Sequence, residues 1–186
     1  MSDTTSDDLT FTVVVNDEDQ YSIWPATDPL PAGWAAAGFT GRREACLAHI
    51  EAVWVDMRPR SVREALARAV NEWQLAHWVD HEPRLKASIV VPYEDGAASA
   101  AEIRRWAGDP RFCQVLLMSR TCEPLGRQRY WPIYEAAAEA GLPVGIHAFG
   151  YSGHAMTNGG WPSFYVEEVQ EHATSAQAQV ASMVVE

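Results

Sequence analysis

The chain has 186 residues, enough for one ordinary domain or for a small domain and part of a second. Its 25 acidic and 14 basic side chains give a net charge of −11, which disfavours nucleic acids and anionic membranes as partners. No apolar run approaches the roughly 20 residues that span a bilayer, and the acidic N-terminal stretch MSDTTSDDLT has no features of a secretion signal.

The first third of the chain predicts a small antiparallel sheet with one helix. Residues 9–15 (LTFTVVV) alternate apolar and polar side chains, as in a half-buried strand. The acidic turn NDED leads to a second strand, QYSIW, which Pro25 ends, and GWAAAGF can form a third. From Gly41 to Trp54 the apolar residues recur at helical spacing. This order predicts an α+β domain in which the helix crosses one face of the sheet.

The rest of the chain, from about residue 67, predicts alternating helices and buried strands. A helix that starts near Ser61 carries five residues on one side: Val62, Leu66, Val70, Trp73 and His77. The apolar runs KASIVVP, FCQVLLM and LPVGIHAFG are typical of strands covered on both faces. Helical segments lie between these runs, and a last helix extends from about Ser163 to Glu186. The alternation predicts parallel strands joined by right-handed crossovers.

Three such βα units are fewer than the eight of a closed TIM barrel, which typically takes about 250 residues. We therefore expect residues 67–186 to be an α/β fragment of a TIM barrel that is incomplete within this chain. An open fragment exposes strand edges that can pair with other chains. Loose packing, or self-association through the incomplete barrel, is the expected consequence.

The cysteines bear on the compartment and on metal binding. The sequence has three cysteines, an odd number, and no CxxC pair: Cys46, Cys113 and Cys122. This pattern argues against a disulfide framework and favours a reducing cytoplasm. A zinc site built from closely spaced cysteine pairs is also disfavoured. We therefore expect a cytoplasmic protein, and no cofactor is indicated by these residues.

Four motifs resemble the MbtH-like family, and the match covers about residues 9–66. N-x-E-x-Q-x-S-x-W-P spans 16–25, P-x-G-W spans 31–34, C-L-x-x-I-x-x-x-W spans 46–54, and D-M-R-P-x-S spans 56–61. Val55 departs from the pattern, since the family usually has Thr there. We accordingly expect a first domain at 1–66 and a second region at 67–186.

The resemblance implies a small non-catalytic protein that binds and supports adenylation domains of nonribosomal peptide synthetases. In that family, the tryptophans matching Trp24 and Trp34 form a slot for a small apolar side chain of the partner, and Ser22 lies beside it. Residues 22 and 24 are two apart on a strand and share a face, and Trp34 is a candidate cross-strand neighbour. Paired indoles make rigid interface anchors. The alternative is that both tryptophans are core residues.

Three more residues complete the predicted partner-binding set. Pro25 follows Trp24 within the first motif. Asp56 and Arg58 are either partner contacts or an ion pair at the helix end, and surface ion pairs are common and weak. The expected partner surface therefore consists of six residues: Ser22, Trp24, Pro25, Trp34, Asp56 and Arg58.

From about residue 67 to 186, the chain resembles the amidohydrolase-related family, metal-dependent hydrolases and decarboxylases on a TIM barrel. The resemblance rests on NEWQLAHWVDHEPRLKASIVVP, DPRFCQVLLM, RYWPIYEAAAEAGLPVGIH and GGWPSFYVEE. It implies a metal site with an H-x-H pair, a His after a middle strand and a late Asp. His147 matches the middle His, and the sequence has no H-x-H. His147 is thus an isolated metal-ligand candidate, and a single imidazole does not hold zinc usefully.

Three interpretations remain open. The first is an adenylation-domain partner whose C-terminal part is a passenger. The second is a metal-dependent hydrolase or decarboxylase whose remaining strands are missing from this chain, and only this one implies a divalent metal such as zinc. The third is an accidental join, because the junction falls in SVREALARAVNEWQ without a Gly, Ser or Pro linker.

Overall fold

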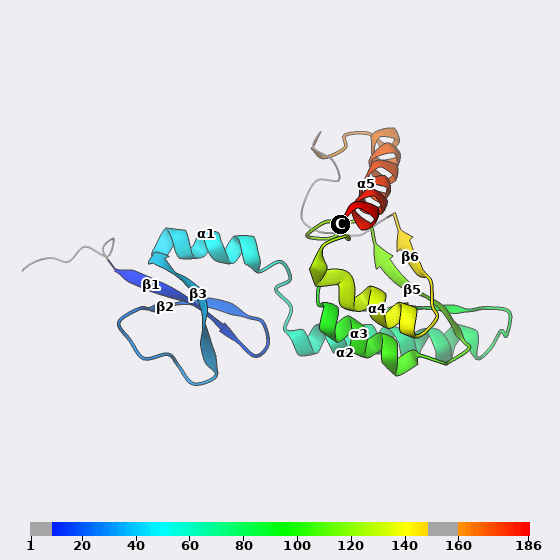
Figure 1. Ribbon diagram of the computed structural model, residues 1–186, viewed down its shortest axis with the longest axis horizontal. Helices are drawn as coiled ribbons and strands as arrows, with labels where there is room; N and C mark the ends of the chain where they lie inside the picture. The colour runs from blue at the N-terminus through cyan, green and yellow to red at the C-terminus, as the bar shows by residue number, and fades with distance from the viewer. Residues whose placement is uncertain (1–8, 149–159) are drawn as a thin grey trace, which may run out of the picture. The chain divides into compact units, whose positions relative to one another are not determined.

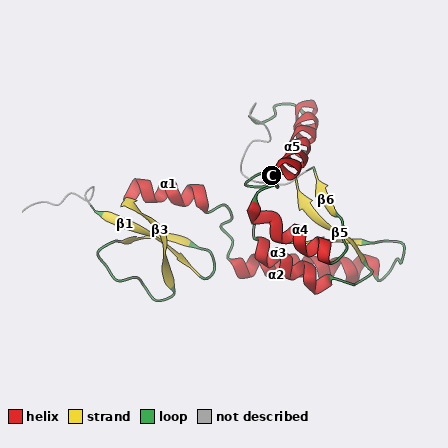
Figure 2. Cartoon of the chain, viewed as in Figure 1, coloured by secondary structure: helices red, strands yellow, loops and turns green. Residues whose placement is uncertain are grey.

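The computed structural model describes residues 9–148 and 160–186 (Figures 1 and 2). They divide into two compact units, the first ending at Arg63 and the second beginning at Glu64. The first contains the expected antiparallel sheet and helix, and the second contains parallel strands and helices. Across the two described ranges, no helix combines the length and the apolar character needed to cross a membrane.

The sheet of unit 1 is built around strand β1 (Thr10–Asn16), which lies between β2 (Tyr21–Pro25) and β3 (Trp34–Arg42). Both pairings are antiparallel, and the register of β1 against β3 shifts between Thr12 and Val14. The expectation that Trp34 neighbours β2 is therefore wrong. Residues 26–33 form a connection too long for a tight hairpin, and it carries the chain across the sheet to the free edge of β1.

The turn between β1 and β2 is closed by its own polar side chains. Asn16 Oδ1 accepts hydrogen bonds from the main-chain N–H groups of Glu18 (3.0 Å) and Gln20 (2.9 Å). Asn16 Nδ2 also donates to Gln20 Oε1 at 2.9 Å. Asp19 has a φ of 59°, a left-handed conformation that Asp tolerates in turns. Asn16 and Gln20, two residues of the first motif, thus shape the turn.

Helix α1 (Arg43–Val53) covers one face of this sheet. Cys46, the buried residue of the helix, donates from Sγ to the Phe11 carbonyl at 3.3 Å. The ring of Tyr21 contacts the indole of Trp54, directly after the helix, at a centroid distance of 5.9 Å. The face that carries Tyr21 is therefore the helix-covered face.

Unit 2 is built on a parallel sheet with the order β4-β5-β6. Its strands are β4 (Ala87–Val90), β5 (Phe112–Met118) and β6 (Val144–His147). Buried residues alternate with half-buried ones along β4, so the expected complete cover on both faces is wrong. Helices pack against one face, and the described residues place no second layer of helices on the other. Residues 149–150 of the third expected strand lie outside the described residues.

Helices α2 (Arg60–Gln74), α3 (Gly96–Trp106) and α4 (Trp131–Glu139) enclose the core of unit 2 (Figure 1). A π-helical turn, Leu75–Val79, extends α2, and a 3-10 turn, Gln128–Tyr130, precedes α4. Helix α5 (Tyr165–Val185) lies near the C-terminal ends of β5 and β6. One buried cluster joins the sheet to these helices and includes Ile89, Ile103, Val115, Leu117 and Ile133. Continuation into a barrel stays a prediction.

The side of α2 that faces the core is not the large apolar side marked in the sequence. The buried residues of α2 are Ala67 and Asn71, whereas Val62, Leu66 and Trp73 are 48%, 49% and 50% exposed. Small side chains allow a helix to approach a sheet closely, so the row through Ala67 packs inward. The large apolar residues are left facing solvent.

Asn71 closes the outer edge of β4. Its Nδ2 donates to the Val90 carbonyl at 2.9 Å, and its Oδ1 accepts from the Val90 N–H at 2.8 Å. Gln74 Nε2 donates to the Ser88 carbonyl at 3.2 Å. Alternate main-chain groups of an edge strand point away from the sheet and invite pairing with other chains. At β4, this expected liability is covered by side chains of α2.

Candidate partner-binding face

Ser22, Trp24 and Trp34 lie on the face of the first sheet that is turned away from α1. Successive residues of a strand point to opposite faces, so residues 22 and 24 lie opposite to the helix-covered side of Tyr21. Ser22 pairs with Val14 of β1, so the two residues share a face. Trp34 of β3 pairs with Asn16, which is two residues after Val14 and therefore lies on the same face. The expectation that Ser22 and Trp24 share a face is confirmed.

The two tryptophans flank a small floor between them. Ser22 and Ala36 both pair with Val14 from opposite sides, and both are exposed. Trp24 and Trp34 are diagonal neighbours of Val14 from the two outer strands, and the Val14 side chain is 1% exposed although α1 lies on the other face. Neighbouring strands lie about 4.8 Å apart, so β2 and β3 are roughly 10 Å apart, and the β1 partners of the two tryptophans, Thr12 and Asn16, are four residues or about 13 Å apart along the strand. The two tryptophans therefore lie diagonally across this face, with the small residues Ser22 and Ala36 between them.

The loop after β2 fixes the orientation of Trp24. The indole Nε1 of Trp24 donates to the Pro29 carbonyl at 3.0 Å, which satisfies the polar edge of the ring. The ring is half-buried, so part of its apolar surface stays accessible. Pro25 pairs with Phe11 and, by alternation, belongs to the helix-covered face. The structure thus places Ser22, Trp24 and Trp34 on one face of the sheet and Pro25 on the other.

Asp56 and Arg58 form a bidentate ion pair in the segment between α1 and α2. Arg58 Nη2 lies 2.7 Å from Asp56 Oδ2, and Arg58 Nε donates to Oδ1 at 3.0 Å. Burial tends to raise the pKa of Asp56, but hydrogen bonds from the Arg58 side chain and N–H outweigh it and hold this pKa below its usual value. The Arg58 side chain is 56% exposed, and its role in partner binding stays a prediction.

A second contact inside unit 1 was missed from the sequence. The carboxylate of Glu18 accepts a hydrogen bond from the Ser61 N–H at 2.9 Å, and the Glu18 carbonyl accepts from the Arg60 N–H at 3.1 Å. Asp19 forms an ion pair with Arg63. The hydrogen bond from the Ser61 main chain is the largest influence that lowers the pKa of Glu18. The free N–H groups at the first turn of a helix attract carboxylates, but Glu18 lies 43 residues before Ser61, so no local sequence signal marks this contact.

His147 lies at the C-terminal end of β6, as the sequence predicted, and is exposed. Its carbonyl accepts a hydrogen bond from the Ser119 N–H at 2.8 Å, which continues the pairing of β5 with β6. Within residues 9–148 and 160–186, no three His, Cys, Asp or Glu side chains come together in a group that could hold a metal. These residues by themselves do not fit a catalytic divalent metal, which usually takes about three protein ligands.

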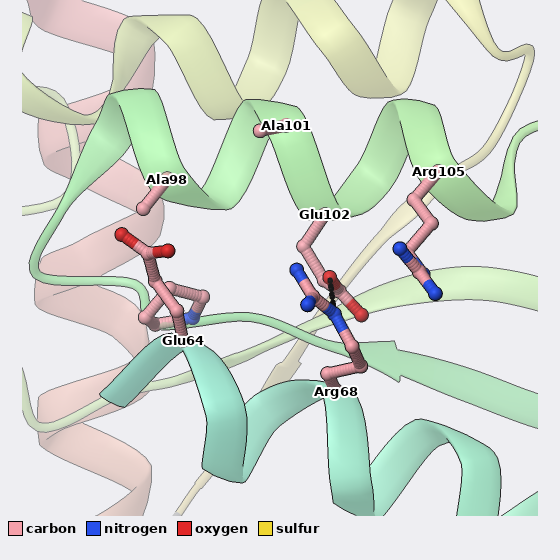
Figure 3. Close-up of a pocket in the computed structure, with 7 residues that line it drawn as sticks. Glu64, Arg68, Ala98, Ala101, Glu102 and Arg105 are labelled. Atoms are coloured by element: carbon pink, nitrogen blue, oxygen red, sulfur yellow. Dashed lines mark ion pairs between the residues drawn. The ribbon is translucent and has the colours of Figure 1, made fainter. Parts of the chain in front are cut away.

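A small cavity of about 160 Å³ lies between α2 and α3 (Figure 3). Glu64, Arg68, Glu102 and Arg105 provide its charged lining. The Glu102 carboxylate, whose residue is 6% exposed, accepts from Trp106 Nε1 at 2.7 Å and lies 3.7 Å from the Arg68 guanidinium. These groups already neutralise and orient one another, so the cavity is explained by packing between the helices.

Comparison with known proteins finds two families. The family described as MbtH-like protein matches residues 1–66, and the family described as amidohydrolase matches residues 44–181. The matches overlap from residue 44 to residue 66. A crystal structure of a candidate amidohydrolase from Staphylococcus aureus is 21% identical and aligns with 64% of this chain, with a TM-score of 0.47. The chain spans 43% of the length of that protein.

Proposed function

This chain belongs to the amidohydrolase family and contains an MbtH-like domain at residues 1–66. From the MbtH-like domain, we propose that unit 1 binds an adenylation domain of a nonribosomal peptide synthetase. The observation that carries the proposal is the open face with Ser22 between Trp24 and Trp34. The unit performs no chemistry itself under this proposal. It supports the solubility and amino-acid-activating activity of its partner through binding.

The geometry of this face suits a small apolar side chain of the partner. Ser22 and Ala36 leave room between the two indoles, and the buried Val14 provides a firm floor. Aromatic residues that contact a partner's apolar side chain often dominate interface energetics. Truncating one indole is therefore expected to cost at least about 2 kcal/mol of binding, or roughly 30-fold in affinity.

Amino-acid-dependent pyrophosphate exchange by a candidate adenylation domain tests the proposal. We expect the full chain to stimulate exchange, Trp24→Ala to lose most of that stimulation, and the matched variant Trp78→Ala to retain it. Trp78 is 55% exposed and belongs to unit 2. Because Trp24 also shields Val14, a second variant is needed that keeps both indoles.

Ser22→Arg supplies that variant. Ser22 is exposed, so a longer side chain is tolerated by the fold while it fills the space between the indoles. We expect Ser22→Arg to keep the thermal stability of the full chain and to abolish stimulation. Lack of stimulation by the unmodified chain across several adenylation domains would contradict the proposed function.

A second candidate is a metal-dependent hydrolase or decarboxylase. The amidohydrolase match over residues 44–181 favours it, together with the position of His147 at the C-terminal end of a parallel strand, where TIM barrels place catalytic groups. Within residues 9–148 and 160–186, the side chains by themselves do not supply the ligands for the family's metal. The measurement is the metal content of the purified full chain. Stoichiometric zinc would support this candidate, and metal-free protein after purification with zinc present would oppose it.

A further inference from the structure

Helix α5 packs against unit 2 through its polar side. Gln179, which is 9% exposed, donates from Nε2 to the Ser119 carbonyl at 2.7 Å and accepts from the Leu125 N–H at the same distance. Ser182 Oγ accepts from the Gly126 N–H at 3.0 Å. Hydrogen bonds to the segment after β5 therefore hold the helix in place.

The outward side of α5 is apolar. Val166, Val169, Val180 and Val184 are 77%, 51%, 55% and 81% exposed. With two alanines they recur at spacings of three and four residues and form one stripe along the helix, here called the α5 stripe: Val166, Val169, Ala173, Ala176, Val180 and Val184. A helix on the surface of a globular protein normally turns such a stripe toward the core. A contiguous exposed apolar patch marks an interaction surface.

We propose that the α5 stripe is a self-association surface on which α5 of a second copy of this chain packs antiparallel. Charge selects this direction. Glu167, Glu168 and Glu171 crowd the first two turns, whereas residues 173–185 contain no Asp, Glu, Lys or Arg. A parallel pair would bring the acidic turns of the two copies side by side. An antiparallel pair places each acidic turn beside the uncharged end of its partner.

An ion pair stands just beyond residues 173–185. The Arg127 side chain is 56% exposed, and its Nη1 lies 3.3 Å from Glu186 Oε2. In the antiparallel pair, the acidic first turns of one copy approach Arg127 of the other. Because Glu186 pairs with Arg127, this end carries no net charge that repels the acidic turns, and the apolar contact between the stripes has to outweigh the repulsion that an overall charge of −11 imposes on two copies.

The stripe is also complementary to itself when reversed. With a two-fold axis between Ala173 and Ala176, Val166 of one copy faces Val184 of the other, and Val169 faces Val180. Each apolar position then meets an apolar position, as an isologous two-fold interface requires. The alanines lie at the centre, where small side chains let two helices approach closely. The pairing length, at 1.5 Å per residue, is about 30 Å.

Light scattering of the full chain after size exclusion tests the proposal. We expect a dimer, and we expect the double variant Val180→Glu with Val184→Glu to give a folded monomer. Val62→Glu is the matched control, because Val62 is an exposed helical valine outside the α5 stripe, and it should leave the dimer intact. Circular dichroism confirms that each variant keeps its helices.

Cysteine cross-linking tests the direction and does not depend on a variant that disrupts the surface. In a background with Cys113→Ser and Cys122→Ser, we expect Val166→Cys combined with Val184→Cys to form an intermolecular disulfide. Neither replacement alone should form one, because a disulfide needs Cα atoms within about 7 Å. Efficient cross-linking by either single replacement would overturn the antiparallel arrangement.

Two further results would overturn the proposal as a whole. A chain that stays monomeric over a wide range of concentration would show that the α5 stripe does not mediate self-association. A dimer that survives the double glutamate variant would place the contact between copies on another face.

Discussion

Asn71 on α2 provides a sharp test of how side chains of this helix stabilise β4, the edge strand of the sheet in unit 2. Its side chain is fully buried and has hydrogen bonds to both the N–H and the carbonyl of Val90, at 2.8 and 2.9 Å. Its Nδ2 also lies 3.1 Å from Glu102 Oε1. Asn71→Leu keeps nearly the same side-chain shape and removes all of these bonds.

The magnitude follows from the groups that lose a partner. A buried main-chain polar group left without a hydrogen bond costs about 1–3 kcal/mol, so two such groups cost about 2–6 kcal/mol. Val90 is half-buried, which favours the lower part of that range. Glu102 keeps its bond from Trp106 Nε1 at 2.7 Å. The added apolar surface of leucine returns on the order of 1 kcal/mol. We therefore expect a loss of about 3 kcal/mol, a large share of the stability of a typical domain.

Urea denaturation of the full chain, combined with amide hydrogen exchange, measures this effect. We expect the Val90 amide to lose protection in Asn71→Leu, while the Ala87 amide, which donates to the Arg111 carbonyl at 2.9 Å, keeps its protection in folded molecules. Glu72→Gln on the same helix is the control, since the Glu72–Arg105 pair is exposed and 3.8 Å apart. An Asn71→Leu variant within about 0.5 kcal/mol of the unmodified chain, with the Val90 amide unchanged, would refute the reasoning.

Three further predictions concern titration and local contacts. Asp56 has a lowered pKa in the folded chain, so its contribution to stability is complete above an ordinary Asp pKa of about 3.9 and is lost as pH falls through the lowered value. An NMR titration of the Asp56 carboxyl should show a midpoint below about 3.9, and an ordinary midpoint would oppose this prediction. Burial raises the pKa of Tyr134 to about 12, so the stability of the folded chain falls as pH rises from about 10 toward that value. Tyr134→Phe should remove one late-titrating phenol from the ultraviolet titration. An unchanged late phase would contradict the assignment to Tyr134. Gln74→Leu removes the bond to the Ser88 carbonyl and a longer one, of 3.4 Å, to Asn71 Oδ1. Because only one main-chain group loses its partner, the change should cost only about 1 kcal/mol in urea denaturation, clearly less than Asn71→Leu.

The order of the elements could be predicted because each has a local cause. Alternating residues marked β1, and helical spacing marked α1. The two apolar runs after α2 marked β4 and β5, since long apolar segments separated by helices favour parallel strands. Both similarities to known families were also visible, because their motifs combine uncommon residues at fixed spacing.

Strand order and helix orientation could not be predicted in the same way. Sequence order does not show whether β3 pairs with β2 or β1, and the choice of β1 separates Trp24 from Trp34 by a whole strand. Helix α2 offered two candidate faces, and large residues such as Trp73 suggested the wrong one. A hint lay in Ala67, Asn71 and Leu75, four residues apart, because a single Asn within an apolar row often satisfies a specific buried main-chain group.

The predicted partner surface divides in a similar way. Ser22, Trp24 and Trp34 could be recognised from motif spacing, and alternation on β2 assigned two of them to one face. The roles of Glu18 and Asn16 could not, because they depend on contacts with the start of α2 and within the turn. Glu18 contacts a residue far away in the sequence, and Asn16 contacts the main chain of a turn whose conformation the motif does not specify.

The most direct test of the proposed function is calorimetric titration of a purified adenylation domain with the full chain. We predict saturable binding at one site, a loss of affinity of roughly 30-fold or more for Trp24→Ala, and unchanged affinity for Trp78→Ala. Binding that is equally strong with Trp24→Ala and with Ser22→Arg would contradict it, because the partner would then occupy a surface other than the face between the two indoles.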